Sequence, residues 1–332
     1  MERDKYWDSL KFILIFLVVY GHIASHYLGN SHFNMAIYNL IYFFHMPLFI
    51  FVSGRFSHLR DRKKYKRGII RLMETYLVFQ IIRTIASVLF EKELLSLAFL
   101  TTPNWILWYL IVLIYWRLLI YMIHGRFGPL WIQLNRHSII MTSFCISMIA
   151  GFIPIDNPFG IQRALSFLPF FVVGYYSVDI DVRKLINKIP IALAIMIIFA
   201  AFVILYVLND NFDYIHHCSF PYWSEDWFHT LLMFGLRCLF FVVSFVISAS
   251  VMRLVPSSSL FAGWGRATMF IFLYHSFALR EVLFPLIVSS AIMQHPLILF
   301  VHAIIVTAIL LVFSYSKFLN YLMNPISHFS SK

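Results

Sequence analysis

The stretch SLKFILIFLVVYGHIASHYL (Ser9–Leu28) determines the fold class of this 332-residue chain. It contains one lysine and two histidines among residues that are otherwise mostly aliphatic or aromatic. As an α-helix, a stretch of about 20 residues extends about 30 Å, the thickness of the hydrocarbon core of a bilayer. The segment Met1–Lys11 is short and mixed in charge, and no small-residue cleavage site follows it. We therefore predict a retained transmembrane helix.

The composition of the whole chain extends this prediction. Hydrophobic residues make up 61% and charged residues only 12%, whereas soluble domains carry about 25% charged residues. Such a chain cannot cover a water-facing surface, which excludes a soluble enzyme, a disordered tail and a nucleic-acid-binding protein. Its net charge of +11 comes from basic residues that lie beside apolar segments, as in membrane proteins. Three cysteines are too few for a disulfide framework.

Nine further segments have the apolar character of a membrane span. We predict an all-α polytopic membrane protein, a single bundle of about ten transmembrane helices with no separate soluble domain within residues 1–332. The predicted spans are residues 9–28, 35–54, 68–90, 104–123, 137–154, 163–178, 189–208, 229–252, 267–289 and 296–315.

The distribution of lysine and arginine orients these helices. Most of the 26 basic residues fall in alternate connections or at the termini, whereas the other connections contain only Lys92 and Arg163. Because positive residues concentrate on the cytoplasmic side, both termini are predicted to be cytoplasmic, which agrees with an even number of spans. The outer connection Asn209–Trp227 is acidic and aromatic. An interfacial aromatic belt is the favoured role for it, over stacking on sugar rings.

Ionisable residues within a span are costly and usually face a cavity or a partner. Lys11 and His22 are 11 residues apart, which places them on nearly the same helix face with a rise of about 16 Å. Asp8 precedes Lys11 by one turn and can pair with it. A neutral imidazole at the depth of His22 suits a general base for a hydroxyl group. The alternative is that His22 only hydrogen-bonds a neighbouring helix.

Other spans contain three further candidates. His45 is followed by Pro47, which removes a backbone donor and should kink the second helix; the kink either opens a polar site or is merely packed around. His275 is expected to line the cavity, and interhelical pairing is favoured for Arg83. The run His216-His217-Cys218 resembles metal ligands only superficially, because no second ligand pair lies at a useful spacing. No metal is expected.

The run RFSHLRDRKKYKRGIIR (Arg55–Arg71) is the most basic part of the chain. It is expected to anchor the helix at the cytoplasmic face or to contact anionic lipids. It also has the features of a phosphate-binding mouth. Arg67 and Arg71 share a helix face at i,i+4, and Glu74 lies where it can orient Arg71.

At these residues the sequence resembles the acyltransferase 3 family of integral-membrane acyltransferases. Three motifs carry most of the resemblance: YWDSLKFILIFLVVYGH (Tyr6–His22), FFHMPLFIFVSG (Phe43–Gly54) and KRGIIRLMETY (Lys66–Tyr76). Weaker matches are NWILWYL (Asn104–Leu110), FLPFFVVGYY (Phe167–Tyr176) and FLYHS (Phe272–Ser276). Two departures concern Lys11, where the family commonly has Arg, and Glu74, where it often has Pro. Lysine lacks the planar guanidinium of arginine, which can donate two parallel hydrogen bonds. The resemblance therefore does not specify the contact that Lys11 makes.

The resemblance implies an O-acetyltransferase of sugars, close to fucose 4-O-acetylase-like proteins, in a bacterial inner membrane. Acetyl-CoA from the cytoplasm would donate its acetyl group to a sugar hydroxyl in exopolysaccharide or cell-envelope biosynthesis. His22 would act as general base or as an acyl relay. The catalytic residues would be His22, Lys11, Asp8 and His45; the acetyl-CoA contacts Lys66, Arg67, Arg71 and Glu74; and the acceptor contacts His275, Arg83 and Trp108.

Two other functions fit the same helices. A transporter or flippase of a glycan or lipid-linked sugar also needs buried charges and a polar stripe. Transporters often show paired halves with broken helices, and the sequence shows no such repeat. A non-catalytic relative that senses or scaffolds in the membrane is less favoured, because Asp8, Lys11 and His22 are all present.

Overall fold

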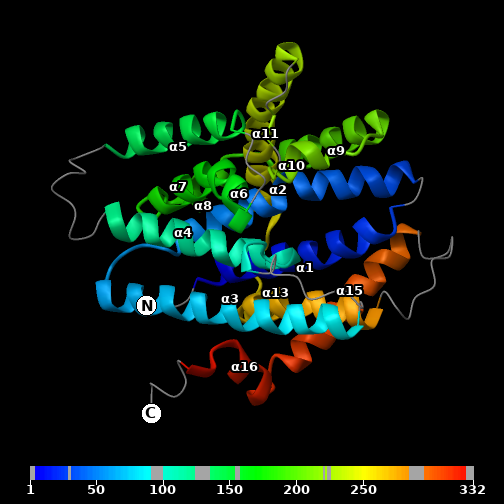
Figure 1. Cartoon of the computed structure of the whole chain (residues 1–332). Helices are drawn as coiled ribbons and strands as arrows, with labels where there is room; N and C mark the ends of the chain where they lie inside the picture. The colour runs from blue at the N-terminus through cyan, green and yellow to red at the C-terminus, as the bar shows by residue number, and fades with distance from the viewer. Residues whose placement is uncertain are drawn as a thin grey trace. The chain divides into compact units, whose positions relative to one another are not determined.

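The computed structural model describes residues 4–28, 31–90, 100–123, 135–153, 158–219, 221–222, 226–283 and 295–326. These residues form helices and connections without any strand, which confirms the predicted all-α class (Figure 1). Among them, seven helical segments are long and apolar enough to cross a membrane. They are α1 (Lys5–His26), α2 (His32–Arg55), α3 (Arg62–Phe90), η2 with α4 (Trp105–Ile123), α9 (Ile191–Leu208), α11 (Trp227–Leu254) and α15 (Pro296–Phe313).

The other three predicted spans are shorter or interrupted. The fifth is α5 (Arg136–Ala150), a helix of 15 residues. The sixth is divided into α6 (Ile161–Ser166) and α7 (Leu168–Tyr176), because the proline at the start of α7 has no backbone N–H to continue the preceding helix. The ninth begins as α13 (Thr268–Phe277) and continues as a π-helical turn, Ala278–Leu283. Residues 284–294 lie outside the described residues, so the count of ten stays a prediction.

The chain divides into two compact units, each assembled from separate segments. Unit 1 comprises Met1–Val52, Ile180–His217 and Cys238–Tyr315, and unit 2 comprises Ser53–Asp179, Cys218–Arg237 and Ser316–Lys332. The prediction that residues 1–332 form a single domain stays a prediction. The short helices are η3 (Pro158–Gly160), α8 (Val182–Ile186), α10 (Asp213–His216), α12 (Ser259–Trp264), η4 (Gly265–Ala267) and α16 (Lys317–Met323).

In unit 1, α1 is surrounded by α12, η4, α13 and α15. The Tyr6 hydroxyl donates a hydrogen bond of 2.7 Å to the backbone oxygen of Met252 in α11. Gly265 lets η4 approach α1 closely, because a Cβ there would overlap the backbone carbonyl of Asp8. The start of α1 is therefore fixed by tight backbone packing as well as by apolar contacts.

The second helix of unit 1 tolerates its internal proline for a local reason. Pro47 cannot donate to the carbonyl of Phe43, four residues earlier, so that buried oxygen needs another donor. The hydroxyl of Ser244, on α11, supplies it at 2.6 Å. Because the lost hydrogen bond is replaced, α2 continues through Pro47 to Arg55.

In unit 2, α3 packs against α4 and α16. The helix begins after Asp61, whose carboxylate accepts hydrogen bonds from the backbone N–H groups of Lys63 and Lys64. The hydrogen bond from Lys64 lowers the pKa of Asp61. This cap starts α3 at the middle of the basic run and so presents the following lysines and arginines on a regular helix.

Candidate active site

The centre of the candidate site is His22, which unit 1 holds between α2 and α13. His22 is partly buried. Its Nδ1 lies 3.5 Å from the hydroxyl of Tyr42 on α2, and its ring stacks on that of His275 on α13 with centroids 5.3 Å apart. The structure thus brings together two of the predicted residues, His22 and His275, and adds Tyr42.

A glycine next to His22 makes this contact possible. The Tyr42 ring passes so close to Gly21 that a Cβ at that position would lie 2.9 Å from the ring. Real Cβ atoms do not approach other atoms so closely, and any side chain at position 21 would therefore push Tyr42 away from His22. Gly21 therefore leaves the space that the Tyr42 ring occupies when its hydroxyl contacts His22.

Tyr42 also contacts three further histidines of the unit. The ring centroids of His45, His216 and His217 lie 4.6, 5.1 and 5.4 Å from that of Tyr42. His45 is buried, and its Nδ1 lies 2.8 Å from the backbone oxygen of Ile41. A carbonyl oxygen only accepts, so this Nδ1 carries the proton and the lone pair is on Nε2.

His275 has the same tautomer for the same reason. Its Nδ1 lies 3.0 Å from the backbone oxygen of Ile271, and the side chain is fully buried. The hydrogen bond fixes the plane of the ring that stacks on His22. The His275 ring is therefore held in a fixed orientation against the His22 ring.

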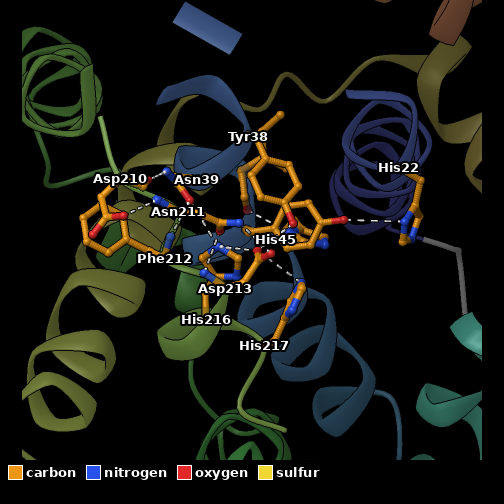
Figure 2. Close-up of polar contacts among 12 residues, drawn as sticks. His22, Tyr38, Asn39, His45, Asp210, Asn211, Phe212, Asp213, His216 and His217 are labelled. Atoms are coloured by element: carbon orange, nitrogen blue, oxygen red, sulfur yellow. Dashed lines mark hydrogen bonds and ion pairs between the residues drawn. The ribbon is translucent and has the colours of Figure 1, made fainter. Parts of the chain in front are cut away.

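The short helix α10 is tied to α2 by a polar network (Figure 2). The Tyr38 hydroxyl donates to Asp213 Oδ1 at 2.8 Å, and the Asn39 amide donates to the backbone oxygen of Asp210 at 2.7 Å. His216 Nε2 lies 3.3 Å from Asn39 Oδ1. Burial lowers the pKa of His216 well below its ordinary value, with a smaller effect from His217 in the same direction, so the His216 ring is neutral at pH 7.

Asp8 and Lys11 form the expected pair at the start of α1. Lys11 Nζ lies 3.4 Å from Asp8 Oδ1, and the lysine side chain is 22% exposed. Lys11 precedes His22 on α1 by about three helical turns. The structure places Lys11 at a partly open position and Asp8 in the packed wall beside η4.

The residues predicted to contact CoA lie in unit 2. Lys66, Arg67 and Arg71 are all exposed along the first turns of α3. Glu74 is buried, and its carboxylate accepts a hydrogen bond from the backbone N–H of Ile326. That Glu74 orients Arg71 stays a prediction.

Two of the predicted acceptor contacts also lie in unit 2, whereas His275 lies in unit 1. Arg83 is fully buried in α3. The guanidinium of Arg163 lies 4.7 Å from the ring centroid of Trp108. The ring of Phe167, which also belongs to unit 2, stacks on Trp108. That Trp108 and Arg83 contact the acceptor stays a prediction.

Sequence reasoning missed Tyr42 and did not connect the histidines of α10 with α2. One signal was available: Tyr38 and Tyr42 are four residues apart and therefore share a helix face. The contact of that face with α10 is not local. It joins residues more than 170 positions apart, which a periodicity argument cannot detect.

The fold defines an all-α integral-membrane protein, and its candidate site is a group of histidines within unit 1. A family model described as an acyltransferase domain matches residues 4–318, nearly the whole chain. The chain belongs to the acyltransferase 3 family, and it is a membrane acyltransferase. No curated protein and no solved structure matches it.

Proposed function

We propose that this protein is an O-acetyltransferase that moves an acetyl group from cytoplasmic acetyl-CoA to a sugar hydroxyl in a glycan or glycan precursor. The acyltransferase activity follows from the family. The observation that supports the specific reaction is the setting of His22, an imidazole that contacts the Tyr42 hydroxyl and stacks on His275. The proposed location is a bacterial inner membrane.

His22 is proposed to act as the general base. In the reactive tautomer, Nδ1–H donates to the Tyr42 oxygen and the lone pair on Nε2 takes the proton of the sugar hydroxyl. The sugar oxygen attacks the thioester carbon, and a tetrahedral intermediate forms. Its collapse breaks the carbon–sulfur bond, and the proton on Nε2 passes to the leaving thiolate. The products are an acetylated sugar and free CoA, and the reaction needs no metal.

Stabilisation of the oxyanion and binding of the donor involve other residues. His45 is proposed to orient Tyr42, because its ring contacts Tyr42 and its bond to Ile41 holds it rigidly. Its Nε2 carries a lone pair, so the N–H or O–H donor that stabilises the oxyanion is a different group. Lys66, Arg67 and Arg71 are proposed to bind the CoA phosphates, since exposed guanidinium and ammonium groups on one helix suit several phosphates.

The test of the function uses the purified protein in nanodiscs with acetyl-CoA and a mixture of mono- and oligosaccharides. Release of free CoA and a sugar product heavier by one acetyl group are the expected results. Sugar flux in proteoliposomes without acetyl-CoA, together with no thioester turnover for any acceptor, would establish the transporter alternative instead.

Substitution of Tyr42 by phenylalanine is expected to lower kcat about tenfold, because it removes a hydrogen bond to the catalytic imidazole worth on the order of 1.5 kcal/mol in the transition state. The ring remains, so packing against Gly21 is retained. Rates of CoA release measure the effect. Tyr206→Phe, which removes an exposed hydroxyl on α9, is the control and should leave kcat unchanged; equal rates for both variants would remove Tyr42 from the mechanism.

Substitution of Arg71 by alanine is expected to raise KM for acetyl-CoA about tenfold with kcat little changed, because a phosphate contact contributes equally to the ground state and transition state. Arg136→Ala removes an equal charge from the start of α5 and serves as the control. Comparing acetyl-CoA with its 3′-dephospho analogue shows whether Arg71 meets that phosphate. A KM unchanged by Arg71→Ala would place the phosphates elsewhere.

A further inference from the structure

In unit 2, an arginine of α4 extends to the backbone of α3. The Nε of Arg117 donates a hydrogen bond of 3.1 Å to the Ser57 hydroxyl. That hydroxyl donates its own proton to the backbone oxygen of Ser53 at 2.7 Å, so it is oriented to accept from Arg117. A Cβ on Gly68 of α3 would lie 3.3 Å from Arg117 Nη1. The guanidinium is therefore held through Nε, with Nη1 against α3.

The charge of Arg117 has no negative partner within the described part of the chain. No carboxylate there forms an ion pair with this arginine, and no acceptor there takes a hydrogen bond from its terminal nitrogens. Arg117 lies in a helix that is long and apolar enough to cross a membrane, and it is only partly exposed. An ionisable group in that setting usually has a partner or faces a cavity. The terminal N–H groups are therefore available to an anion.

A second polar group beside Arg117 also lacks a partner. The Tyr65 side chain, on α3, is only 7% exposed, and its hydroxyl has no hydrogen-bond partner among the described residues. The guanidinium carbon of Arg117 lies 5.5 Å from the centroid of the Tyr65 ring. Buried polar atoms of this kind are rare, and each one calls for an explanation. An anion oxygen would satisfy the hydroxyl, because the hydroxyl can donate to it.

Contacts from both helices fix the Tyr65 ring. The ring of Tyr121, on α4, lies parallel to it with centroids 6.4 Å apart. The guanidinium carbon of Arg62, at the start of α3, lies 4.7 Å from the centroid of the Tyr121 ring. Cation–π contacts of this length are attractive. The cluster thus contains two guanidinium groups and two stacked tyrosines, and it is positively charged.

The donors in this cluster select the class of anion. A guanidinium matches two oxygens of one phosphate or carboxylate through parallel N–H groups. The Tyr65 hydroxyl needs a further acceptor oxygen, which a carboxylate bound in this way no longer offers. A phosphate monoester or a diphosphate has that additional oxygen. The start of α3 and the end of α4 belong to the face predicted to be cytoplasmic, where such groups are present.

We propose that Arg117 and Tyr65 bind a phosphate ester between α3 and α4. Coenzyme A, through its diphosphate, and anionic phospholipids are the two sources of this group at a membrane surface. The first source rests on the proposed acetyl transfer function, whereas the site itself does not. The site also differs from the exposed basic residues of α3. Tyr65 and Arg67 are two residues apart and point to nearly opposite faces of the helix, so they contact different groups.

The experiment measures binding of CoA to the full chain in nanodiscs of phosphatidylcholine by titration calorimetry. Arg117→Gln is expected to raise Kd about tenfold, the usual loss for a charge-assisted hydrogen bond. Tyr65→Phe keeps the ring and should raise Kd about threefold. Without ligand, Tyr65→Phe should leave Tm unchanged or raise it, because it removes an unpaired buried hydroxyl. The same losses with dephospho-CoA, which lacks the 3′-phosphate, would assign the site to the diphosphate.

Two matched controls should bind CoA as the wild type does. Arg253→Gln removes a partly exposed arginine whose Nε also makes one hydrogen bond, to the backbone oxygen of Ile189 at 2.8 Å. Tyr76→Phe removes the hydroxyl of another buried tyrosine on α3, three turns beyond Tyr65.

A second measurement distinguishes the two sources of phosphate. Nanodiscs of phosphatidylcholine mixed with phosphatidylglycerol are examined by native mass spectrometry for lipid that remains bound to the chain. Phosphatidylglycerol that the wild type retains and Arg117→Gln loses, with CoA affinity unchanged, would identify a phospholipid. A wild type that binds no CoA would contradict the proposed function and leave the site to the lipid measurement. The proposal is overturned if neither CoA affinity nor lipid retention depends on Arg117 or Tyr65.

Discussion

Replacement of His22 by alanine is expected to reduce acetyl transfer by about 10²–10⁴-fold, the usual contribution of a positioned general base. The loss should appear in kcat, because the proposed role of the imidazole is to accept a proton in the transition state. It contributes little to binding of acetyl-CoA. Initial rates of CoA release by the purified protein in nanodiscs measure it. An acyl relay through His22 would lose activity equally, so the wild type should also be quenched with labelled acetyl-CoA. Label retained on the protein identifies the relay.

The matched control lies one turn later on the same helix. His26 is exposed at the end of α1, so His26→Ala removes an imidazole from the same helix and leaves His22 in place. Its rate should stay within about twofold of the wild type, and both variants should unfold at the wild-type temperature. A fully active His22→Ala protein would refute the proposed mechanism while leaving the family assignment intact.

Replacement of Gly265 by alanine is expected to destabilise the protein by about 2–3 kcal/mol or more. The added Cβ would overlap the backbone carbonyl of Asp8, and a backbone atom cannot rotate aside as a side chain can. Either α1 or η4 must shift, and Tyr6, whose hydroxyl bonds the backbone oxygen of Met252, precedes Asp8 on α1 by two residues. The measurement is thermal unfolding in detergent, followed by the loss of helical circular dichroism.

Gly263 provides the comparison for this variant. It lies two residues earlier, and a Cβ there would meet no heavy atom within 4 Å. Gly263→Ala should be neutral or slightly stabilising, because alanine favours the helix by up to about 1 kcal/mol. Equal Tm values for the two alanine variants would show that α1 and η4 are less tightly packed than the structure indicates.

The features that sequence predicted well are local. The first helix was predicted as residues 9–28 and extends over Lys5–His26, because a long apolar run can satisfy its backbone only as a helix in lipid. The Asp8–Lys11 pair is confirmed, with Lys11 Nζ 3.4 Å from Asp8 Oδ1. It is also a local feature, because residues three apart on a helix lie on the same face.

The features that sequence could not supply depend on pairing between distant segments. The contact of Tyr42 with His22 requires the register of α2 against α1. The hydrogen bond from the Ile326 backbone N–H to Glu74 joins residues 252 positions apart. Pro169 lacks the backbone N–H that would continue α6 into α7. Hydropathy is averaged over a whole window, so it does not detect the loss of one hydrogen-bond donor.

Gly21 has a further consequence, for how this chain can change over generations. Every mutation at position 21 adds a side chain, and the Tyr42 ring stands 2.9 Å from where its first carbon would be. A smaller residue at position 42 would make room for it, but that change gives up the hydroxyl that meets His22. Neither position can vary freely alone, and the effects of substitutions at the two should be far from additive. Gly21 is thus part of the candidate active site although it contributes no functional group.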